Sequence, residues 1–264
     1  MAGSRPMTLD PRAVDDLRRA RAAVLVSIDA ACLRVGRDPG SVTLVAVTKT
    51  VDPERMGAAA AAGLRTFGEN RVQEATAKRA ALTGVDATWH LIGPLQSNKA
   101  RKAVDAFDVI ETIDSLDLAG RIDRLVVDDA TRGGSACAVL LQVNVDADPA
   151  KAGFRPDDVE AALDRLAGMH GLRVDGLMTV GRLVATADEA RTTFVALRAL
   201  SERLRARGAT LGAGLSMGMS DDYEVAVEEG ATIVRVGRAL FGERPHAHDD
   251  ATPPHRHPAG PDAA

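Results

Sequence analysis

The sequence is poor in cysteine. Its 264 residues include only Cys32 and Cys137, which lie far apart in the chain. Two isolated thiols form neither a disulfide framework nor the paired spacing of a zinc site. We therefore expect two reduced thiols, as is usual for cytoplasmic proteins, and no metal site.

Long hydrophobic runs and a strong charge of one sign are also missing. No segment approaches the roughly 20 apolar residues that a membrane-spanning helix needs, and the first residues lack the apolar core of a signal peptide. The net charge is only -4, so the composition gives no reason to expect nucleic acid or an anionic membrane as a partner. We expect a soluble cytoplasmic protein.

Short apolar, β-branched segments alternate with helical segments between residues 10 and 243. The expected strands cover residues 42–49, 66–70, 87–92, 109–113, 138–145, 172–180, 210–217 and 232–236. Helices are expected between and after them, and a leading helix covers residues 10–35. This order predicts an α/β fold, a (β/α)8 TIM barrel with an extra N-terminal helix, rather than an open doubly wound sheet.

The two ends of the chain differ from this pattern. Residues 1–9 are expected to form a flexible N-terminus, and residues 244–264 a disordered tail rich in proline, small residues and charges. The tail holds His246, His248, His255 and His257, which we interpret as solvated rather than as metal ligands.

Lys49 ends the first buried strand. The run from Val42 to Thr48 is apolar and β-branched, and Asp52-Pro53 opens a helix shortly after the lysine. In a barrel the carboxyl ends of the strands carry the chemistry, and a neutral lysine amine there can form a Schiff base with a carbonyl. The alternative is a lysine that extends to solvent, as most lysines do.

Two loops near the end of the chain suit a phosphate group. Residues 215–220, LSMGMS, offer hydroxyls, a glycine and N–H groups before a helix, and Gly237 follows the eighth strand. Barrels often bind phosphate at these two positions, although both glycines could simply shape turns. A rim lysine with a phosphate site fits an aldehyde that bears a phosphate, either pyridoxal 5'-phosphate (PLP) or the sugar phosphate of a Schiff-base aldolase.

The segments AVTKT, FGENRVQE, WHLIGPLQSNK, GLMT, LSMGMSDDYEVAVEEGAT and VRVGRALFG resemble the successive blocks of the pyridoxal phosphate homeostasis protein family, also called the YggS/PROSC family. The resemblance runs from about residue 10 to residue 243. That family is similar to the barrel domain of alanine racemase without its second, β domain.

The resemblance implies PLP as the cofactor, held as a covalent aldimine on Lys49. It implies that Ser216 and the backbone of Gly237 and Arg238 hold the phosphate, and that Arg235 faces the pyridine nitrogen. The remaining implied cofactor-binding residues are Asn70, Met178, Met217 and Gly218. The chain departs from the family pattern in two places. A proline is common soon after the GLM block, where this chain reads GLMTVGRL over residues 176–183, and a small hydroxyl residue is common at the position of Arg238.

Two polar groups leave alternatives open. His90, Gln96, Asn98 and Lys99 either border the mouth of the PLP site or mark a partner surface; otherwise His90 packs locally with Trp89, and Ser97 and Asn98 cap a helix. We interpret Asp221 and Asp222 as charges in the first turn of a helix.

A racemase needs an acid or base on both faces of its substrate. The family resemblance supplies no second domain here, and Tyr223 is the single tyrosine of the sequence. An arginine opposite the pyridine nitrogen cannot protonate it, which makes the ring a weaker electron sink. We interpret the chain as a monomeric PLP-binding protein of PLP homeostasis that buffers or delivers PLP without turnover and has no catalytic residue. Apo PLP-dependent enzymes are candidate partners, and a PLP-dependent racemase or lyase is the alternative.

Overall fold

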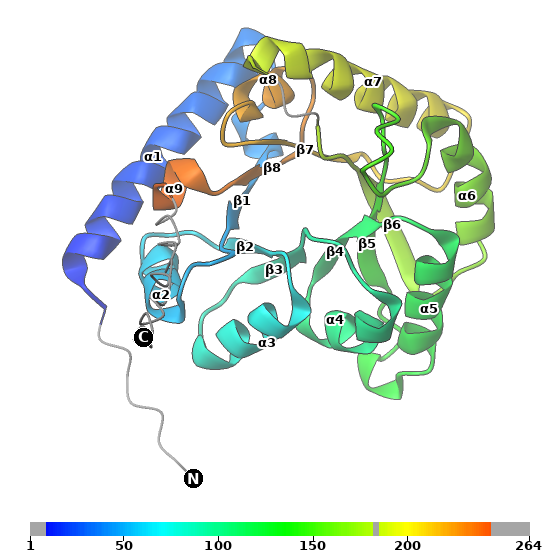
Figure 1. The fold of residues 1–264 in the computed structure, drawn as a ribbon, viewed down its shortest axis with the longest axis horizontal. Coiled ribbons are helices and arrows are strands. Elements are labelled where there is room, and N and C mark those ends of the chain that lie inside the picture. Colours follow the sequence, from blue (N-terminus) through cyan, green and yellow to red (C-terminus); the bar gives the residue numbers. More distant parts are fainter. Residues whose placement is uncertain (1–8, 182–184, 244–264) are drawn as a thin grey trace, which may run out of the picture.

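The computed structural model describes residues 9–181 and 185–243, and in it eight parallel strands close into a barrel (Figure 1). Each strand pairs with the next along the chain, and the last pairs with the first. The strands are β1 (Thr43–Val47), β2 (Thr66–Glu69), β3 (Thr88–Leu91), β4 (Val109–Ile113), β5 (Cys137–Gln142), β6 (Leu172–Met178), β7 (Gly214–Met219) and β8 (Ile233–Val236). The predicted (β/α)8 barrel is confirmed.

Helices cover the outside of the barrel (Figure 1). They are α1 (Pro11–Arg34), α2 (Pro53–Ala61), α3 (Val72–Ala81), α4 (Ala100–Ala106), α5 (Leu116–Val127), α6 (Val159–Leu166), α7 (Ala187–Ala206), α8 (Tyr223–Glu228) and α9 (Arg238–Phe241). Short 3-10 turns occur at Pro39–Ser41, Ser97–Lys99, Ala130–Arg132 and Pro156–Asp158. The extra N-terminal helix α1 packs against α2, α8 and α9.

The helices on either side of Lys49 begin where the sequence predicts. The Asp10 carboxylate accepts the Arg12 N–H at 2.9 Å, and the Asp52 carboxylate accepts the Arg55 N–H at 2.8 Å. Each is followed by a proline at the first helical position, and such a cap stabilises a helix by about 1 kcal/mol. The start of α2 therefore fixes how the chain leaves the strand end that carries Lys49.

Three local predictions are wrong. The segment 215–220 is not a loop, because β7 continues to Met219 with a register shift against β8. Asp222 is not in the first turn of α8 but precedes the helix, and its carboxylate accepts the Met219 N–H at 2.6 Å. The spacing of Thr186 and Glu189 predicts a capping box at the start of α7. The Thr186 hydroxyl instead bonds to the Glu189 carboxylate and accepts no backbone N–H of the helix.

Apolar side chains fill the space between the barrel wall and the helices. Phe67 and Trp89, register neighbours on β2 and β3, meet with ring centroids 5.6 Å apart. Within residues 9–181 and 185–243, no helix is long and apolar enough to cross a membrane. Residues 1–8, predicted to be flexible, and the predicted disordered tail with His246, His248, His255 and His257 lie outside the described residues.

Candidate functional site

Lys49 lies two residues beyond the end of β1, in a turn at the carboxyl rim of the barrel. The turn is closed by the Val51 N–H, which donates to the Thr48 carbonyl at 2.9 Å. Thr50 adopts a left-handed conformation with φ of 70°, which is uncommon for a residue other than glycine. The Lys49 side chain is half-buried, so the lysine stands at the edge of the barrel interior rather than on the open surface.

The loops that follow β7 and β8 meet at one hydroxyl. The N–H groups of Gly237 and Arg238 both donate to the Ser220 hydroxyl oxygen, at 3.1 Å each. Two N–H groups that converge on one oxygen are the arrangement that binds phosphate oxygens. The predicted convergence of these loops is therefore present, but the hydroxyl at its centre belongs to Ser220.

Gly237 joins this cradle to the lysine strand. A Cβ atom at this position would lie 3.4 Å from the Val47 Cβ, which is van der Waals contact. The small residue lets the backbone after β8 approach the end of β1, two residues before Lys49. The lysine turn and the cradle formed by Ser220, Gly237 and Arg238 thus lie on neighbouring strands of the same rim.

A chain of buried polar side chains crosses the interior of the barrel. The Ser216 hydroxyl on β7 donates to Glu111 Oε2 on β4 at 2.5 Å, and β5 and β6 separate these two strands in the wall. His90 Nδ1 lies 2.6 Å from Glu111 Oε1. Arg235 bonds to the Ser216 hydroxyl and donates to the Thr179 carbonyl at 2.7 Å.

Burial and neighbouring charges shift the pKa values of these buried side chains in opposite directions. Burial disfavours the ionised Glu111 carboxylate, but the His90 hydrogen bond, the charges of His90 and Arg235 and the Ser216 hydrogen bond outweigh it and lower its pKa. Burial lowers the pKa of Arg235, while Glu111, 3.7 Å away, and Asp222 oppose that shift. An arginine stays protonated in proteins, so Arg235 and Glu111 form a compensated charge pair inside the barrel.

The other predicted site residues fall into two groups. Met178 and Met217 are fully buried near the carboxyl rim, and Met178 is the register neighbour of Ser216. Gly218 has φ of 89°, and a Cβ there would lie 2.5 Å from the Ala226 Cβ, so the glycine is required for the packing of α8. Asn70 is half-buried directly after β2, where Gly93 packs against its backbone.

Sequence reasoning missed Ser220 and Glu111 and left His90 undecided. Ser220 stands four residues after Ser216 and one residue beyond β7, and a register shift of β7 against β8 lies between them. His90 belongs to the interior chain through Glu111, whereas Gln96, Ser97 and Asn98 are exposed and Lys99 is half-buried. The grouping of Ser216 with Gly237 and Arg238 stays a prediction.

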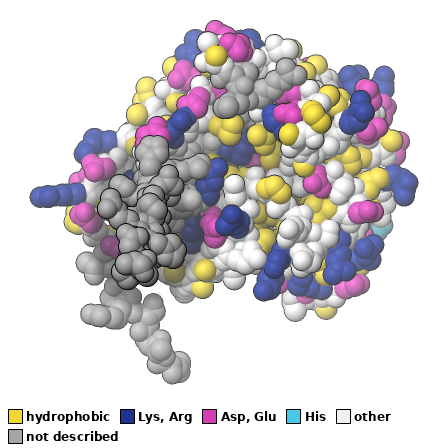
Figure 2. All heavy atoms as spheres, in the orientation of Figure 1, with side chains coloured by type: hydrophobic (Ala, Val, Ile, Leu, Met, Phe, Trp, Pro, Cys, Tyr) yellow, Lys and Arg dark blue, Asp and Glu magenta, His cyan; other side chains and the backbone are white. Residues whose placement is uncertain are grey.

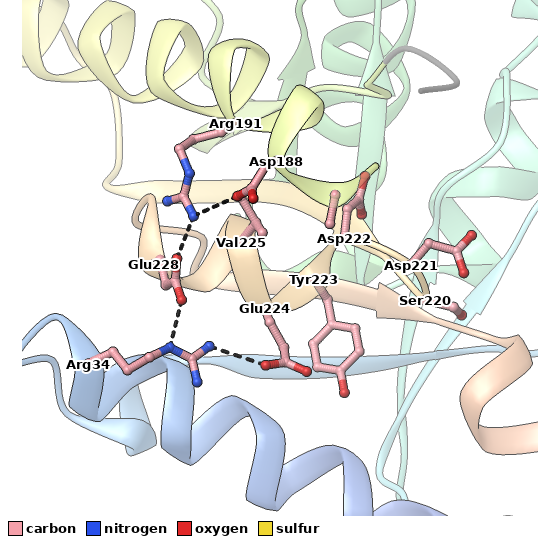
Figure 3. Close-up of a pocket in the computed structure, with 11 residues that line it drawn as sticks. Arg34, Asp188, Arg191, Ser220, Asp221, Asp222, Tyr223, Glu224, Val225 and Glu228 are labelled. Atoms are coloured by element: carbon pink, nitrogen blue, oxygen red, sulfur yellow. Dashed lines mark hydrogen bonds and ion pairs between the residues drawn. The ribbon is translucent and has the colours of Figure 1, made fainter. Parts of the chain in front are cut away.

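A polar cavity of about 290 Å³ lies beside the cradle, between α1, α7 and α8 (Figure 3). Arg34 bridges Glu224 and Glu228, and Arg191 bridges Glu228 and Asp188, so ion pairs between the three helices close one side of it. Ser220 lines the cavity, but neither Lys49 nor Arg235 does. The cavity therefore includes neither the lysine turn nor the buried arginine.

Charged side chains of both signs are interspersed on the face shown in Figure 2. A mixed surface of this kind produces no extended field of one sign. This face of the described residues therefore offers no basic area of the kind that binds nucleic acid.

The chain matches the family model of the alanine racemase N-terminal domain over residues 33–245. It is 41% identical over 223 residues to the pyridoxal phosphate homeostasis protein of Pseudomonas aeruginosa, and the matched region covers 84% of this chain and 94% of that relative.

Solved structures resemble it as well. PipY of Synechococcus elongatus, solved with PLP bound, is 42% identical, with a TM-score of 0.74 over 86% of this chain and 100% of PipY. Alanine racemase of Corynebacterium glutamicum shares the fold with a TM-score of 0.64 at 18% identity, over 89% of this chain but 63% of the racemase.

Proposed function

This chain belongs to the family of the pyridoxal phosphate homeostasis proteins, and we propose that it binds PLP at the carboxyl rim of its barrel and buffers or delivers it. One observation carries the proposal: the Lys49 turn, the Ser220 cradle and the buried Arg235 come from strands β1, β7 and β8, which are neighbours in the closed barrel. The likeness to PipY, which was solved with PLP bound, supports it.

The residues at this rim fit the chemical groups of PLP. The phosphate would be held by the Ser220 hydroxyl with the N–H groups of Gly237 and Arg238, because both N–H groups already bond to the Ser220 oxygen and the three groups therefore lie together. The guanidinium of Arg235 would face the pyridine nitrogen as a donor that keeps its own proton. Asn70, Met178, Met217 and Gly218 would border the ring and the phosphate, while Ser216 would hold Arg235.

Lys49 would bind PLP by a reversible covalent link. PLP would supply an aldehyde with which the neutral Lys49 amine could form a Schiff base, and the aldehyde oxygen would leave as water with the two amine protons. Water reverses the reaction and releases the same aldehyde. A link that forms and hydrolyses without any other reactant suits a protein that stores PLP and passes it on.

We propose carriage rather than turnover, with no catalytic residue. Arg235 is held by Glu111, Ser216 and the Thr179 carbonyl, and it offers no proton to the pyridine nitrogen. Tyr223 is buried on α8, where its backbone packs against Gly218. Its side chain lines the cavity beside α8, which Lys49 does not line, and this argues against Tyr223 as the second acid or base of a racemase.

Under this proposal the chain acts as a cytoplasmic monomer. Apo PLP-dependent enzymes are the partners that would take up the released PLP.

The first test is the absorbance spectrum of the purified full chain with added PLP, followed by borohydride reduction and mass spectrometry. We expect a visible band, and a reduced adduct on Lys49 that is absent in Lys49→Ala. Lys102→Ala changes an exposed lysine of α4 and should behave as the unmodified chain. A protein that stays colourless with PLP would refute the proposal, and trapping of a sugar phosphate in its place would favour an aldolase.

The second test separates the two serines. Ser220→Ala should weaken PLP binding but leave binding of unphosphorylated pyridoxal unchanged, since it removes a phosphate contact. Ser216→Ala should affect both ligands alike, because that hydroxyl bonds to Arg235 and Glu111. Amino-acid turnover at rates typical of PLP enzymes, lost in Lys49→Ala, would favour a racemase or lyase over a carrier.

A further inference from the structure

A second buried polar cluster lies behind the lysine turn, outside the barrel wall. Glu69 ends β2, and its Oε1 lies 2.8 Å from Lys78 Nζ on α3. The exposed fractions of the two side chains are 0% and 10%. The Thr48 hydroxyl donates to the same Glu69 oxygen at 2.5 Å, and Lys78 donates to the Thr48 carbonyl at 2.8 Å.

Every polar group of Thr48, the residue before Lys49, has a hydrogen-bond partner. The Thr48 N–H donates to the Gly68 carbonyl at 2.9 Å, and its carbonyl accepts both Lys78 and the Val51 N–H. That carbonyl belongs to the peptide bond that joins Thr48 to Lys49. Because a peptide unit is planar, fixing its oxygen with two donors also fixes the direction in which the Lys49 backbone leaves the strand.

The ion pair is not an efficient source of stability. A buried pair loses solvation that its attraction only partly restores, and well-packed apolar residues of similar volume are often as stable or more stable. Among the described residues, Glu69 Oε2 is buried and has no hydrogen-bond partner, which adds a further cost. Burial, the main influence on this carboxyl, raises its pKa although Lys78 and Thr48 lower it. A role other than stabilising the fold would explain why the chain has a buried ion pair that stabilises it so inefficiently.

We propose that Glu69 and Lys78 are positioning residues, which hold the Thr48–Lys49 peptide in the geometry that the lysine needs to react with PLP. The proposal rests on the proposed function. The side-chain hydrogen bonds of Glu69 and Lys78 reach Thr48 and each other, so their proposed effect on PLP passes through Thr48. A turn with a left-handed Thr50 is under strain, and such a turn needs fixed neighbours to keep one conformation.

The test is the double variant Glu69→Met/Lys78→Met, which removes both charges and keeps similar volumes. Thr48 keeps partners in it, since its carbonyl still accepts Val51 and its hydroxyl lies 3.4 Å from the Gly68 carbonyl. We expect a stability in urea equal to or above that of the unmodified chain. We also expect faster hydrogen exchange across residues 46–52 without PLP, and a PLP dissociation constant about tenfold higher, a change of about 1.4 kcal/mol.

The control replaces an exposed ion pair, Glu160 with Arg207 at 2.7 Å, by two glutamines, and it should change neither exchange nor affinity. A double variant that loses stability but keeps unmodified exchange and PLP affinity would overturn the proposal, because the pair would then serve packing only. If the double variant does not fold, Thr48→Val removes the hydroxyl bond alone. It should give smaller changes of the same sign, and a folded Thr48→Val with neither change would also overturn the proposal.

The two proposals fail in different ways. If the unmodified chain binds no PLP, the proposed function is wrong, while the exchange experiment on the PLP-free protein still tests whether the pair holds the Lys49 turn. If the unmodified chain binds PLP and the double variant binds it equally well, only the positioning role is wrong.

Discussion

Replacing Glu111 by glutamine should destabilise the protein by about 3 kcal/mol at neutral pH. The carboxylate is fully buried and has three partners: His90 at 2.6 Å, Ser216 at 2.5 Å and Arg235 at 3.7 Å. The substitution keeps the shape of the side chain but leaves the buried Arg235 charge uncompensated. Breaking a buried pair from one side costs about 3–5 kcal/mol, and the lower end applies because the amide oxygen can still accept from Ser216.

The loss should depend on pH with a definite sign. The pKa of Glu111 is lower in the folded protein than its usual value of 4.5, so its contribution is present above that value. It is lost as the pH falls through the lower pKa of the folded state. The difference between the unmodified chain and Glu111→Gln should therefore stay constant from neutral pH down to about 5 and shrink below that.

Urea unfolding followed by circular dichroism measures both quantities. The control is Glu160→Gln, which removes one charge of the exposed pair with Arg207 and should cost no more than about 0.5 kcal/mol. If Glu111→Gln costs no more than this control, the interior charges are not coupled in the way the distances indicate.

Four further predictions concern the described residues away from the lysine turn. Gly218→Ala should cost about 2–4 kcal/mol in urea unfolding, because its Cβ would lie 2.5 Å from the Ala226 Cβ at a positive φ. Gly208→Ala, with φ of 82° and no atom within 4 Å, should cost about 1 kcal/mol. Arg191→Ala removes ion pairs of 2.7 Å with Glu228 at the end of α8 and with Glu229 directly after it. The substitution should lower the melting temperature less in 1 M salt than in dilute buffer, because salt already weakens these ion pairs by screening. The pKa of the buried Cys137 thiol is raised to about 11, so a thiol reagent near neutral pH should label it only after unfolding, since the thiolate is the reactive form.

The fold could be predicted because its determinants are local. The apolar, β-branched run before Lys49 is typical of a buried strand. Asp10-Pro11 and Asp52-Pro53 each combine an N-cap residue with a proline at the first helical position, which predicts the start of a helix. Eight repeats of one pattern then leave few alternatives to a barrel. None of these inferences needs a contact between distant parts of the chain.

The interior of the site could not be predicted, because its contacts are not local. Glu111 and Ser216 are 105 residues apart in the sequence, and no spacing rule connects them. Glu111 sits in VIETI, where alternation indicates a strand but does not tell what an inward carboxylate meets. The glycine at 218 resembles a turn residue in the sequence, whereas the register shift lets it continue β7 and moves the cradle hydroxyl to Ser220.

The positions of the two buried polar clusters support a shared purpose. The cluster of His90, Glu111, Ser216 and Arg235 lies inside the barrel, and that of Thr48, Glu69 and Lys78 lies outside its wall. Buried charges spread through a fold at random would give no reason to look for function, since apolar residues stabilise a core better. Here one cluster holds the arginine proposed to face the ring and the other holds the peptide that enters Lys49. The buried charges, which stabilise the barrel least, thus lie where the orientation of Lys49 and Arg235 matters most. This distribution is expected when the geometry of a binding site, rather than the stability of the core, determines which residues are buried there.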